Sequence, residues 1–415
     1  MQALNVLIFG SGAREHAIAD SISKSPLLKK LYLAQSGNFK LGEVIDFSDY
    51  EDLAQKCADL NIDIAVFGPE EPLCEGIADI FRKHKVPCIG VDKKFSQLES
   101  SKLFGKKFME KYNIKTAKYS VIAGEAKQSK EFPLFPIHHL PIVIKADGLC
   151  GGKGVVIAYN KEFAQKTINE FLEGKFGESS KTILLEEFLQ GEEASLMSLW
   201  DGKNLLHFPP ARDFKKLNKS PSAPNTGGMG SFCPVRLNDF GQKKLDEYKV
   251  QLEKALKAEK ADFVGFIYSG LIMAQSETGW DWHVLEYNVR LGDPETQAIL
   301  GHLKTDFLEI LQSALTQNMD KIKLQYNEDI SACLTLACEG YPKKPKDNEK
   351  ISIPTGEDIK IFYAGVKEIG GELYSKGGRV LSLCTKSKDP FWDLKNFAKK
   401  IEMKNKYFRT DIEVR

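Results

Sequence analysis

The stretch from Val284 to Thr296 reads VLEYNVRLGDPET. In a strand, successive side chains point to opposite sides, so this stretch would have one apolar face, made of Leu285, Tyr287, Val289 and Leu291. The opposite face would carry Glu286, Asn288 and Arg290. A carboxylate, an amide and a guanidinium on an inward-looking face are costly to bury without a charged partner.

These three polar side chains suit a particular kind of partner. Two oxygen ligands placed two residues apart match Mg²⁺ carrying a nucleotide phosphate, and the arginine matches an anionic substrate. The alternative is a strand face that meets solvent. The choice between the two depends on whether the rest of the chain carries phosphate-binding motifs.

Length, charge and cysteine usage limit the class of protein. A chain of 415 residues is expected to form two or three domains. The formal net charge of +1 gives no reason to expect a nucleic acid or a membrane as partner. No apolar run is long enough to span a bilayer, and the N-terminal residues show neither a basic segment nor a cleavage site. The eight cysteines form no C-x-x-C pair, which favours free thiols in the cytoplasm.

The first hundred residues alternate strand and helix patterns. Apolar runs that predict strands lie at 6–9, 31–33, 64–68 and 86–90, and segments that predict helices lie between them, including 50–60. This alternation predicts a doubly wound parallel sheet, an α/β fold, in an N-terminal domain of residues 1–101.

The pattern changes after residue 102 and predicts a central α+β domain, residues 102–325. Helices are expected at 161–172 and 241–258, and strands at 142–145, 155–157, 182–185, 193–199, 265–273 and 282–291. A proline-punctuated loop is expected from Phe132 to Pro141. A small C-terminal α+β domain, residues 326–415, is expected to contain strands at 332–337 and 378–383.

The segment GSGAREH, residues 10–16, follows the first expected strand and opens a helix. Glycines let a backbone approach a phosphate, and a helix N-terminus offers N–H donors to it. A dinucleotide is disfavoured because Glu15 replaces the third glycine and no acid ends the second strand. The segment therefore predicts a site for the phosphate of a smaller ligand; the alternative is a tight turn that needs glycine.

The segment KADGLCGGKG, residues 145–154, is a second phosphate candidate. It is not a P-loop, since no Ser or Thr follows the lysine and strands lie on both sides. A hairpin with a glycine-rich tip and flanking lysines suits a lid over a triphosphate. A merely mobile loop has a similar composition.

Two further segments carry weaker signals. Residues 186–193, EEFLQGEE, follow an apolar strand and match a surface that takes an adenine and a ribose, although an acidic surface turn explains them as well. Residues 225–230, NTGGMG, form a loop that exposes its backbone, with Asp213 and Lys216 before it.

Taken in order, these motifs resemble those of one known family. The quoted motifs are GSGAREH, GPEEPL (68–73), SSK (100–102), KADGLCGGKGV, EEFLQGEEAS, NTGGMG, LEYNVRLGDPETQ and GGRVL. They are similar to those of the phosphoribosylamine–glycine ligases, or glycinamide ribonucleotide synthetases, of the ATP-grasp superfamily. The resemblance runs from Val6 to about Leu383.

The resemblance implies a reaction and an architecture. ATP, glycine and 5-phosphoribosylamine would give glycinamide ribonucleotide, ADP and phosphate in purine biosynthesis, through a glycyl phosphate. The central domain would be an ATP-grasp domain with a glycine-rich hairpin lid in a subdomain of about 118–186. The N-terminal domain would bind substrate.

The resemblance also implies roles for individual residues. Glu286 and Asn288 would bind Mg²⁺ or Mn²⁺. The implied ATP contacts are Lys102, Lys145, Gly151, Gly152, Lys153, Glu186, Glu187, Phe188, Leu189 and Glu193. The implied substrate contacts are Gly10, Gly12, Arg14, Glu70, Asn225, Thr226, Gly227, Gly228, Arg290, Asp293, Pro294 and Glu295. Catalytic roles fall to Arg290, Asp213 and Lys145.

The chain departs from the family pattern at several points. Ala13 replaces a glycine, Ser100 replaces another, and Cys150-Gly151 stands where paired alanines are usual. Phe214 replaces a histidine, so no role of that histidine is transferred. A glycine-rich stretch is only loosely kept at residues 36–39. Neither metal ligand is lost.

The expected partners are small molecules: phosphoribosylamine, glycine and ATP. The chain is expected to be a monomer, with a transient contact to the amidotransferase that makes phosphoribosylamine, because that amine decomposes readily in water. The alternatives are another ATP-grasp ligase of purine synthesis, and an NAD-binding oxidoreductase or nucleotide sensor built on the N-terminal sheet.

Overall fold

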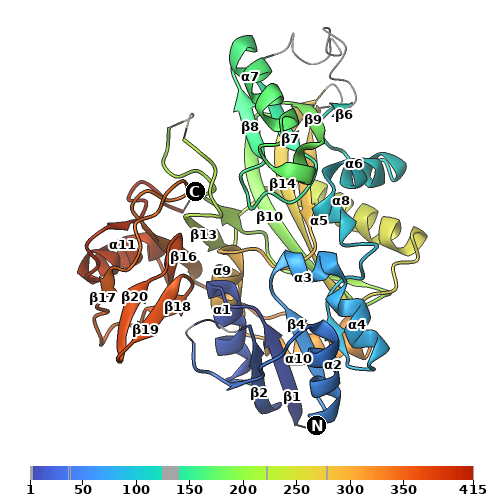
Figure 1. Cartoon of the computed structure of the whole chain (residues 1–415). Coiled ribbons are helices and arrows are strands. Elements are labelled where there is room, and N and C mark those ends of the chain that lie inside the picture. The colour runs from blue at the N-terminus through green and yellow to red at the C-terminus, as the bar shows by residue number, and fades with distance from the viewer. Residues whose placement is uncertain are drawn as a thin grey trace.

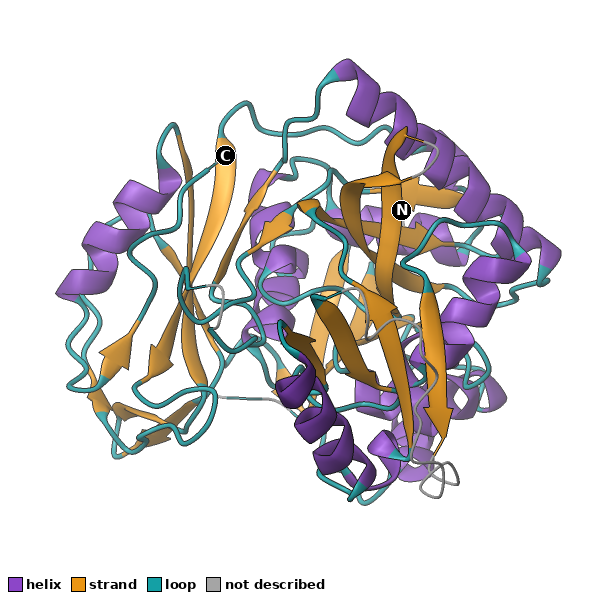
Figure 2. Cartoon of the chain, turned by 90° about the horizontal axis from the view of Figure 1, so that it is seen from above, coloured by secondary structure: helices purple, strands orange, loops and turns teal. Residues whose placement is uncertain are grey.

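The computed structural model describes residues 3–35, 37, 39–123, 140–220, 223–276 and 279–414. Most of the loop expected at 132–141 lies outside these residues. In Figure 1 the N-terminal domain lies at the bottom, the hairpin subdomain at the top and the C-terminal domain at one side. The view from above again shows the C-terminal part to one side, with helices along the outer edges of the molecule (Figure 2).

The N-terminal domain is a five-stranded parallel sheet in the order β3-β2-β1-β4-β5. Its elements are β1 (Leu4–Phe9), α1 (Ala13–Ile22), β2 (Leu28–Ala34), β3 (Glu43–Val44), α2 (Tyr50–Asp59), β4 (Ile64–Phe67), α3 (Glu70–Glu75), α4 (Ile77–Lys83), β5 (Cys88–Ile89) and α5 (Gln97–Ser100). The strand order reverses between β1 and β4, so the loops at Gly10 and Gly68 meet where sheets of this kind bind ligands. The predicted doubly wound sheet is confirmed.

The central domain contains two antiparallel sheets. The hairpin subdomain has the strand order β6-β9-β7-β8 and is built from β6 (Tyr119–Ala123), β7 (Ile142–Ala146), β8 (Val155–Ala158), α7 (Lys161–Leu172), η2 (Gly177–Ser180) and β9 (Thr182–Glu187). The second sheet has the order β11-β10-β14-β15, and the remaining elements are α6 (Lys102–Lys111), β10 (Gly191–Trp200), β11 (Leu205–His207), α8 (Asp239–Ala258), β14 (Gly265–Ser276) and β15 (Gly279–Asn288). Strands β7 and β8 pair antiparallel, so the predicted hairpin is confirmed.

The C-terminal sheet draws two strands from the middle of the chain. Its order is β12-β13-β16-β21-β18, and β22 also pairs with β16. Its elements, with the connecting helices, are β12 (Arg212–Asp213), β13 (Gly230–Cys233), α9 (Glu295–His302), α10 (Phe307–Leu315), η3 (Met319–Lys321), β16 (Ile330–Cys338), β18 (Lys360–Tyr363), β21 (Arg379–Ser387), α11 (Pro390–Lys400) and β22 (Lys406–Tyr407). A small sheet of β17 (Lys350–Ile351), β20 (Glu372–Ser375) and β19 (Val366–Ile369) completes the domain. The NTGGMG loop leads into β13 and is therefore held by the C-terminal domain.

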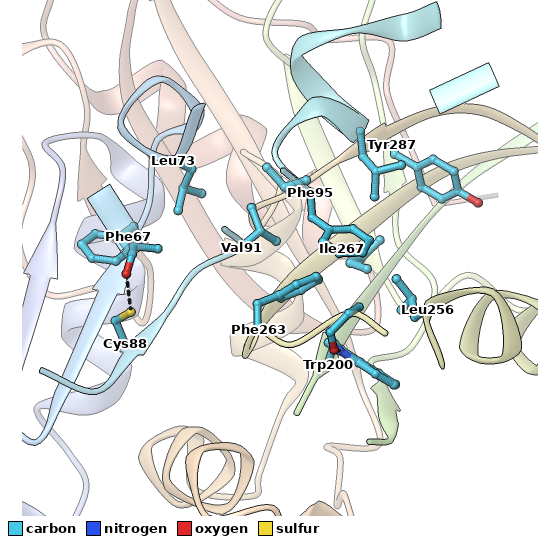
Figure 3. Packing of buried hydrophobic residues seen from close by; sticks show 14 of the residues in the cluster. Phe67, Leu73, Cys88, Val91, Phe95, Trp200, Leu256, Phe263, Ile267 and Tyr287 are labelled. Carbon is cyan, nitrogen blue, oxygen red and sulfur yellow. Dashed lines mark hydrogen bonds between the residues drawn. The ribbon is translucent and has the colours of Figure 1, made fainter. Parts of the chain in front are cut away.

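A shared hydrophobic core fixes the N-terminal domain to the central sheet. Phe67 and Leu73 belong to the same buried cluster as Trp200, Ile267 and Tyr287, as Figure 3 shows. Burying a side chain of this size stabilises the fold by roughly 1.5–3 kcal/mol. Because Tyr287 is anchored in this core, its neighbours Glu286 and Asn288 are held at a fixed place on β15.

The strand expected at 282–291 differs from the structure in two respects. Strand β15 ends at Asn288, so Arg290 lies beyond it. Gly270 pairs with Glu286 and Leu271 with Val284, so Leu285 is an extra residue in a bulge. Leu285 lines the cavity described below instead of joining the apolar face. Strict alternation was therefore wrong at Leu285, because a bulge changes the side on which a residue lies.

Candidate active site

A cavity of about 1170 Å³ lies where the hairpin, the central sheet, the N-terminal domain and the C-terminal sheet meet. Its lining includes most of the expected site residues: Arg14, Glu70, Lys102, Lys145, Gly151, Gly152, Lys153, Glu186, Glu187, Phe188, Leu189, Glu193, Asp213, Asn225, Thr226, Gly227, Glu286, Asn288, Arg290, Asp293 and Glu295. The lining does not include Gly10, Gly12, Gly228 or Pro294. The fold thus brings motifs separated by more than 200 residues to one site.

Glu286 and Asn288 line this cavity from the end of β15. Glu286 forms an ion pair with Lys215, whose Nζ lies 3.5 Å from Oε1. Burial works against the ionised carboxylate, but Lys215, Lys145 and Lys102 outweigh it and hold the pKa of Glu286 below its usual value. Glu286 is therefore ionised at neutral pH.

Glu286 and Asn288 bring a carboxylate and an amide oxygen to the same part of the cavity. Among the described residues, no group of three His, Cys, Asp or Glu side chains is placed to hold a metal ion. A carboxylate and an amide oxygen fit a hard divalent cation whose other ligands are phosphate oxygens and water. The donor set therefore suits a cation that arrives with a nucleotide.

Arg290 is clamped by two carboxylates. Its Nε lies 3.2 Å from Glu70 Oε2, and its Nη2 lies 2.9 Å from Glu99 Oε1. The other oxygen of Glu99 accepts the Val289 N–H at 2.7 Å. Burial raises the pKa of Glu99 to about 7, although Arg290 opposes this shift. The clamp fixes the direction in which the guanidinium faces the cavity.

On the hairpin side, two buried lysines share one carboxylate. Lys145 and Lys106 lie 2.9 and 3.2 Å from Glu186 Oε2. Burial lowers the pKa of Lys106 to about 8, against the attraction of Glu186. Within the described residues, Glu186 Oε1 is buried without a hydrogen-bond partner. An unpaired buried acceptor is costly, so this oxygen is suited to a donor N–H on a bound ligand.

The tip of the hairpin has an open backbone. Gly151 and Gly152 have φ of +55° and +76°, and a Cβ on Gly151 would meet no atom within 4 Å. The tip is tied to α6, because Lys102 Nζ donates to the Gly148 carbonyl at 3.2 Å. The open backbone and the adjacent Lys153 leave room for a phosphate beside the tip.

The loop after β1 is closely packed. Glu15 Oε2 accepts the Gly12 N–H at 2.7 Å, and Oε1 pairs with Arg14 Nε at 2.6 Å. A Cβ on Gly10, Gly12 or Gly68 would lie 2.7, 2.7 or 1.9 Å from an atom of Glu15. These three glycines therefore make room for a carboxylate of the protein itself. Arg14 extends the contact to the segment after β15 by donating to the Leu291 carbonyl at 3.0 Å.

The NTGGMG loop packs against the segment that follows Arg290. Gly228 has φ of +107°, and a Cβ on it would lie 2.3 Å from Pro294 and 2.8 Å from Asp213 Oδ1. This oxygen of Asp213 is buried and, within the described part of the chain, has no hydrogen-bond partner. Burial and the nearby Glu295 raise the pKa of Asp213 well above its usual value. Gly228 and Pro294 thus do not line the cavity themselves, but their close packing positions the residues that do.

Several residues that line the cavity were not predicted as site residues, among them Lys106, Glu99, Lys215 and Arg379. Lys106 lies one helical turn after Lys102 on α6, a spacing that would have revealed it. Arg379 stands within the GGRVL motif, and Lys215 stands two residues after Asp213. Glu99 carried no signal in the sequence, because only the fold brings it to Arg290.

Comparisons with known proteins agree with this architecture. The chain matches the phosphoribosylglycinamide synthetase N domain over residues 4–99, the ATP-grasp (A) domain over 100–296 and the C domain over 331–415. It is 38% identical to a phosphoribosylamine–glycine ligase of Fusobacterium nucleatum, over 99% of this chain and 98% of that protein. A protein of the same name from Clostridium acetobutylicum is 35% identical over 99% of each chain.

Solved structures give the same result. The crystal structure of phosphoribosylamine–glycine ligase from Thermotoga maritima has a TM-score of 0.81 and 31% identity, and the match covers 99% of this chain and 100% of that one. The biotin carboxylase domain of the Hydrogenobacter thermophilus 2-oxoglutarate carboxylase shares the fold, with a TM-score of 0.69 and 16% identity over 98% of this chain and 92% of that one.

The fold and the cavity define an ATP-grasp protein, in which a glycine-rich hairpin faces a sheet that carries Glu286 and Asn288. Within that class, the chain belongs to the phosphoribosylglycinamide synthetase family. The resemblance and the fold class predicted from the motifs are confirmed. No helix formed by the described residues is long and apolar enough to cross a membrane.

Proposed function

We propose that this chain joins glycine to 5-phosphoribosylamine through a glycyl phosphate. Family membership gives the overall reaction, an ATP-dependent ligation in purine biosynthesis that yields glycinamide ribonucleotide, ADP and phosphate. The roles assigned to individual residues rest on one observation: Glu286, Asn288 and Arg290 line the same cavity as the lysines of the hairpin.

The chemistry requires an activated carboxyl group. A carboxylate oxygen of glycine attacks the γ-phosphorus of ATP, the bond to the β-phosphate oxygen breaks, and ADP leaves. The amine of phosphoribosylamine then attacks the glycyl carbonyl carbon, phosphate leaves, and the nitrogen gives up a proton. No covalent enzyme intermediate is needed, so the protein contributes alignment and charge neutralisation.

The nucleotide is proposed to lie between the hairpin and β15. Lys102, Lys145 and Lys153, with the backbone of Gly151 and Gly152, would face the phosphates. Residues 186–189 would take the adenine and Glu193 the ribose. The unpaired Glu186 Oε1 supports this placement, because an adenine offers an amino donor.

A divalent cation, Mg²⁺ or Mn²⁺, is proposed at Glu286 and Asn288. When bound, it would neutralise phosphate charge during transfer. Lys215 lies beside Glu286 on the same side of the cavity. This lysine would keep the carboxylate ionised and add positive charge close to the transferring group.

Glycine and phosphoribosylamine are proposed to lie on the other side of β15. Arg290, held by Glu70, would face the glycine carboxylate and the phosphoryl group. Asp213, the loop 225–228 and the segment 293–295 would surround the glycine. Gly10 and Gly12 would act indirectly, by admitting Glu15 and so placing Arg14.

The division into residues 1–101, 102–325 and 326–415 is retained as a proposal, as are a monomeric state and a cytoplasmic location. A transient contact with the amidotransferase that makes phosphoribosylamine is also proposed. The motivation is the short life of this amine in water. A trapping experiment in which a free competitor intercepts all of the amine in a coupled reaction would argue against the contact.

The test is an assay of ADP release, with phosphoribosylamine generated in place and glycine omitted in the control. Glu286→Ala and Arg290→Ala are each expected to lower kcat at least about a hundredfold, because each removes charge stabilisation of the transferring phosphoryl group. Melting temperature should confirm that both variants fold.

Glu247→Ala, on the exposed face of α8, is the matched control and should keep normal turnover. Glycine-dependent ADP release near the wild-type rate from either cavity variant would refute the assignment. If the wild type releases ADP at the same rate with and without glycine, glycine is not the substrate.

A further inference from the structure

The substrate side of the cavity has two ends that differ in charge. At the N-terminal end, Arg14 and Arg290 face three carboxylates, those of Glu15, Glu70 and Glu99. Both arginines are thus already neutralised by the protein. A phosphate at this end would meet arginines whose charge is already shared with carboxylates of the protein, so it would gain less there than from an unpaired cation.

The C-terminal end has the opposite balance. Arg379 and Lys343 line the cavity there, and the carboxylate that pairs with Arg379 is Asp293, with Nη2 to Oδ2 at 2.9 Å. Lys343 is exposed and makes no ion pair with another described residue. Among the described residues, Asp293 is thus the carboxylate within ion-pair distance of either cation, while Asp213 and Glu295 act on Arg379 from farther away. Lys343 adds a positive charge that no ion pair with a described residue offsets.

Arg379 is fixed by three hydrogen bonds, yet some of its N–H groups remain unpaired within the described structure. Its Nη1 donates to the carbonyls of Gly227 and Asp293, the latter at 3.0 Å, and its Nη2 donates to the Asp293 carboxylate. A guanidinium has five N–H groups. The Nε–H and one Nη2–H therefore have no partner among the described residues and are available to a ligand.

The surroundings of Arg379 form an open wall. Gly378, directly before it, lines the cavity with φ of +61°, and a Cβ there would meet no atom within 4 Å. The segment that carries Lys343 is fixed nearby, because the Tyr341 hydroxyl accepts the Gly227 N–H at 2.9 Å. Arg379 and this segment thus both hold the NTGGMG loop.

We infer that Arg379 and Lys343, with the open backbone at Gly378, bind the phosphate of a sugar phosphomonoester. The inference rests on the proposed function and specifies where the 5-phosphate of the amine substrate sits. It places the phosphate on the C-terminal domain, and not on the glycine loop after β1 that the sequence motif indicates. The ribose then extends from this subsite toward Arg290 and Glu70.

The test uses ribose 5-phosphate and ribose as stable probes, with binding measured by calorimetry on the full chain. The wild type should bind ribose 5-phosphate more tightly than ribose. Arg379→Gln should weaken ribose 5-phosphate binding about 10-fold or more, and Lys343→Ala a few-fold, because charge-assisted contacts to a phosphate are lost. Neither variant should change the affinity for ribose by a similar factor.

Two controls separate a lost phosphate contact from a disturbed fold. Lys388→Ala removes an exposed lysine of the same domain that does not line the cavity, and it should leave both affinities unchanged. ADP affinity should stay at the wild-type value in every variant. If Arg379→Gln loses ADP affinity as well, the inference is judged on whether Lys343→Ala weakens the binding of ribose 5-phosphate.

The inference is overturned if Lys343→Ala and Arg379→Gln, both with normal ADP affinity, bind ribose 5-phosphate as the wild type does. It is also overturned if the wild type prefers ribose. Failure of the proposed function is a separate result, because it would appear as an absence of glycine-dependent ADP release in the wild type.

Discussion

Two glycine-rich segments follow buried strands in this chain, and the structure uses their glycines in opposite ways. After β1, Gly10 and Gly12 surround the carboxylate of Glu15, which takes the N–H that a phosphate would use. After β7, Gly151 and Gly152 keep an open backbone beside the cavity: a Cβ on Gly151 would meet no atom within 4 Å, and one on Gly152 would make only an ordinary contact of 3.7 Å with the Thr226 carbonyl oxygen. The charged residue near the glycines differs between the two segments: the carboxylate of Glu15 fills the first loop, and Lys153 places a positive charge beside the second.

Among the substitutions that test this difference between the two loops, Gly68→Ala is expected to lower stability the most. A Cβ in Gly68→Ala would lie 1.9 Å from Glu15 Oε1. Displacing Glu15 leaves Arg14, only 7% exposed, as a buried charge without its partner. The expected loss is about 3–5 kcal/mol of stability, the usual cost of breaking a buried ion pair.

The measurement for Gly68→Ala is the free energy of chemical unfolding, monitored with a spectroscopic probe in the N-terminal domain. Gly105→Ala, in α6, is the matched control, because its Cβ would make only an ordinary contact of 3.5 Å with Leu98 O. It should be neutral or slightly stabilising. Equal stability of Gly68→Ala and the wild type would show that Glu15 is not confined as described.

Much of the fold follows from the sequence, because local patterns specify it. The alternating apolar runs of the first hundred residues predict the parallel sheet, and the helix expected at 161–172 is α7. The bulge at Leu285 was not predictable, because it depends on how β14 pairs with β15. The joining of β12 and β13 to the C-terminal sheet was also hidden, since it pairs segments about 100 residues apart.

The site shows the same limit. Glu286, Asn288 and Arg290 carry a pattern that indicates their chemistry, and the cavity contains them. Glu99 carries no such pattern, and its role became visible only through its ion pair with Arg290. Arg379 stands in the GGRVL motif, but only the fold shows that it pairs with Asp293. The GSGAREH motif predicts a phosphate loop from its glycines, and the fold adds that Glu15 accepts the Gly12 N–H. A short motif indicates a backbone shape, and the folded neighbours decide what occupies it.

An intermediate effect is expected from His16, which anchors α1, the helix after the first loop, to the C-terminal domain. Its Nδ1 accepts the Tyr363 N–H at 2.9 Å, and its ring stacks on Phe39. Burial lowers the pKa of His16 to about 4, although Asp20 opposes this shift. The unfolded chain gains a proton near pH 6.5 and the folded chain does not. Stability therefore falls as the pH is lowered from about 6.5 to 4, by roughly 2–3 kcal/mol.

The measurement for His16 is the melting temperature as a function of pH, for the wild type and for His16→Gln. The glutamine can accept the same N–H without titrating, so the difference between the two proteins should shrink as the pH falls. A pH-independent difference between pH 4 and 6.5 would show that the ring is not held in its neutral form.

The smallest expected effect is at the open hairpin, where Gly151→Ala tests the other half of the comparison. The new methyl group meets no atom within 4 Å, so the cost comes from φ of +55° alone. A left-handed conformation costs a non-glycine residue about 1 kcal/mol, much less than the change at Gly68. ADP affinity should fall by no more than about fivefold if the tip only approaches the phosphates through its backbone. A loss of stability as large as that of Gly68→Ala would mean that the hairpin tip is as closely packed as the loop after β1, and the contrast between the two loops would then be wrong.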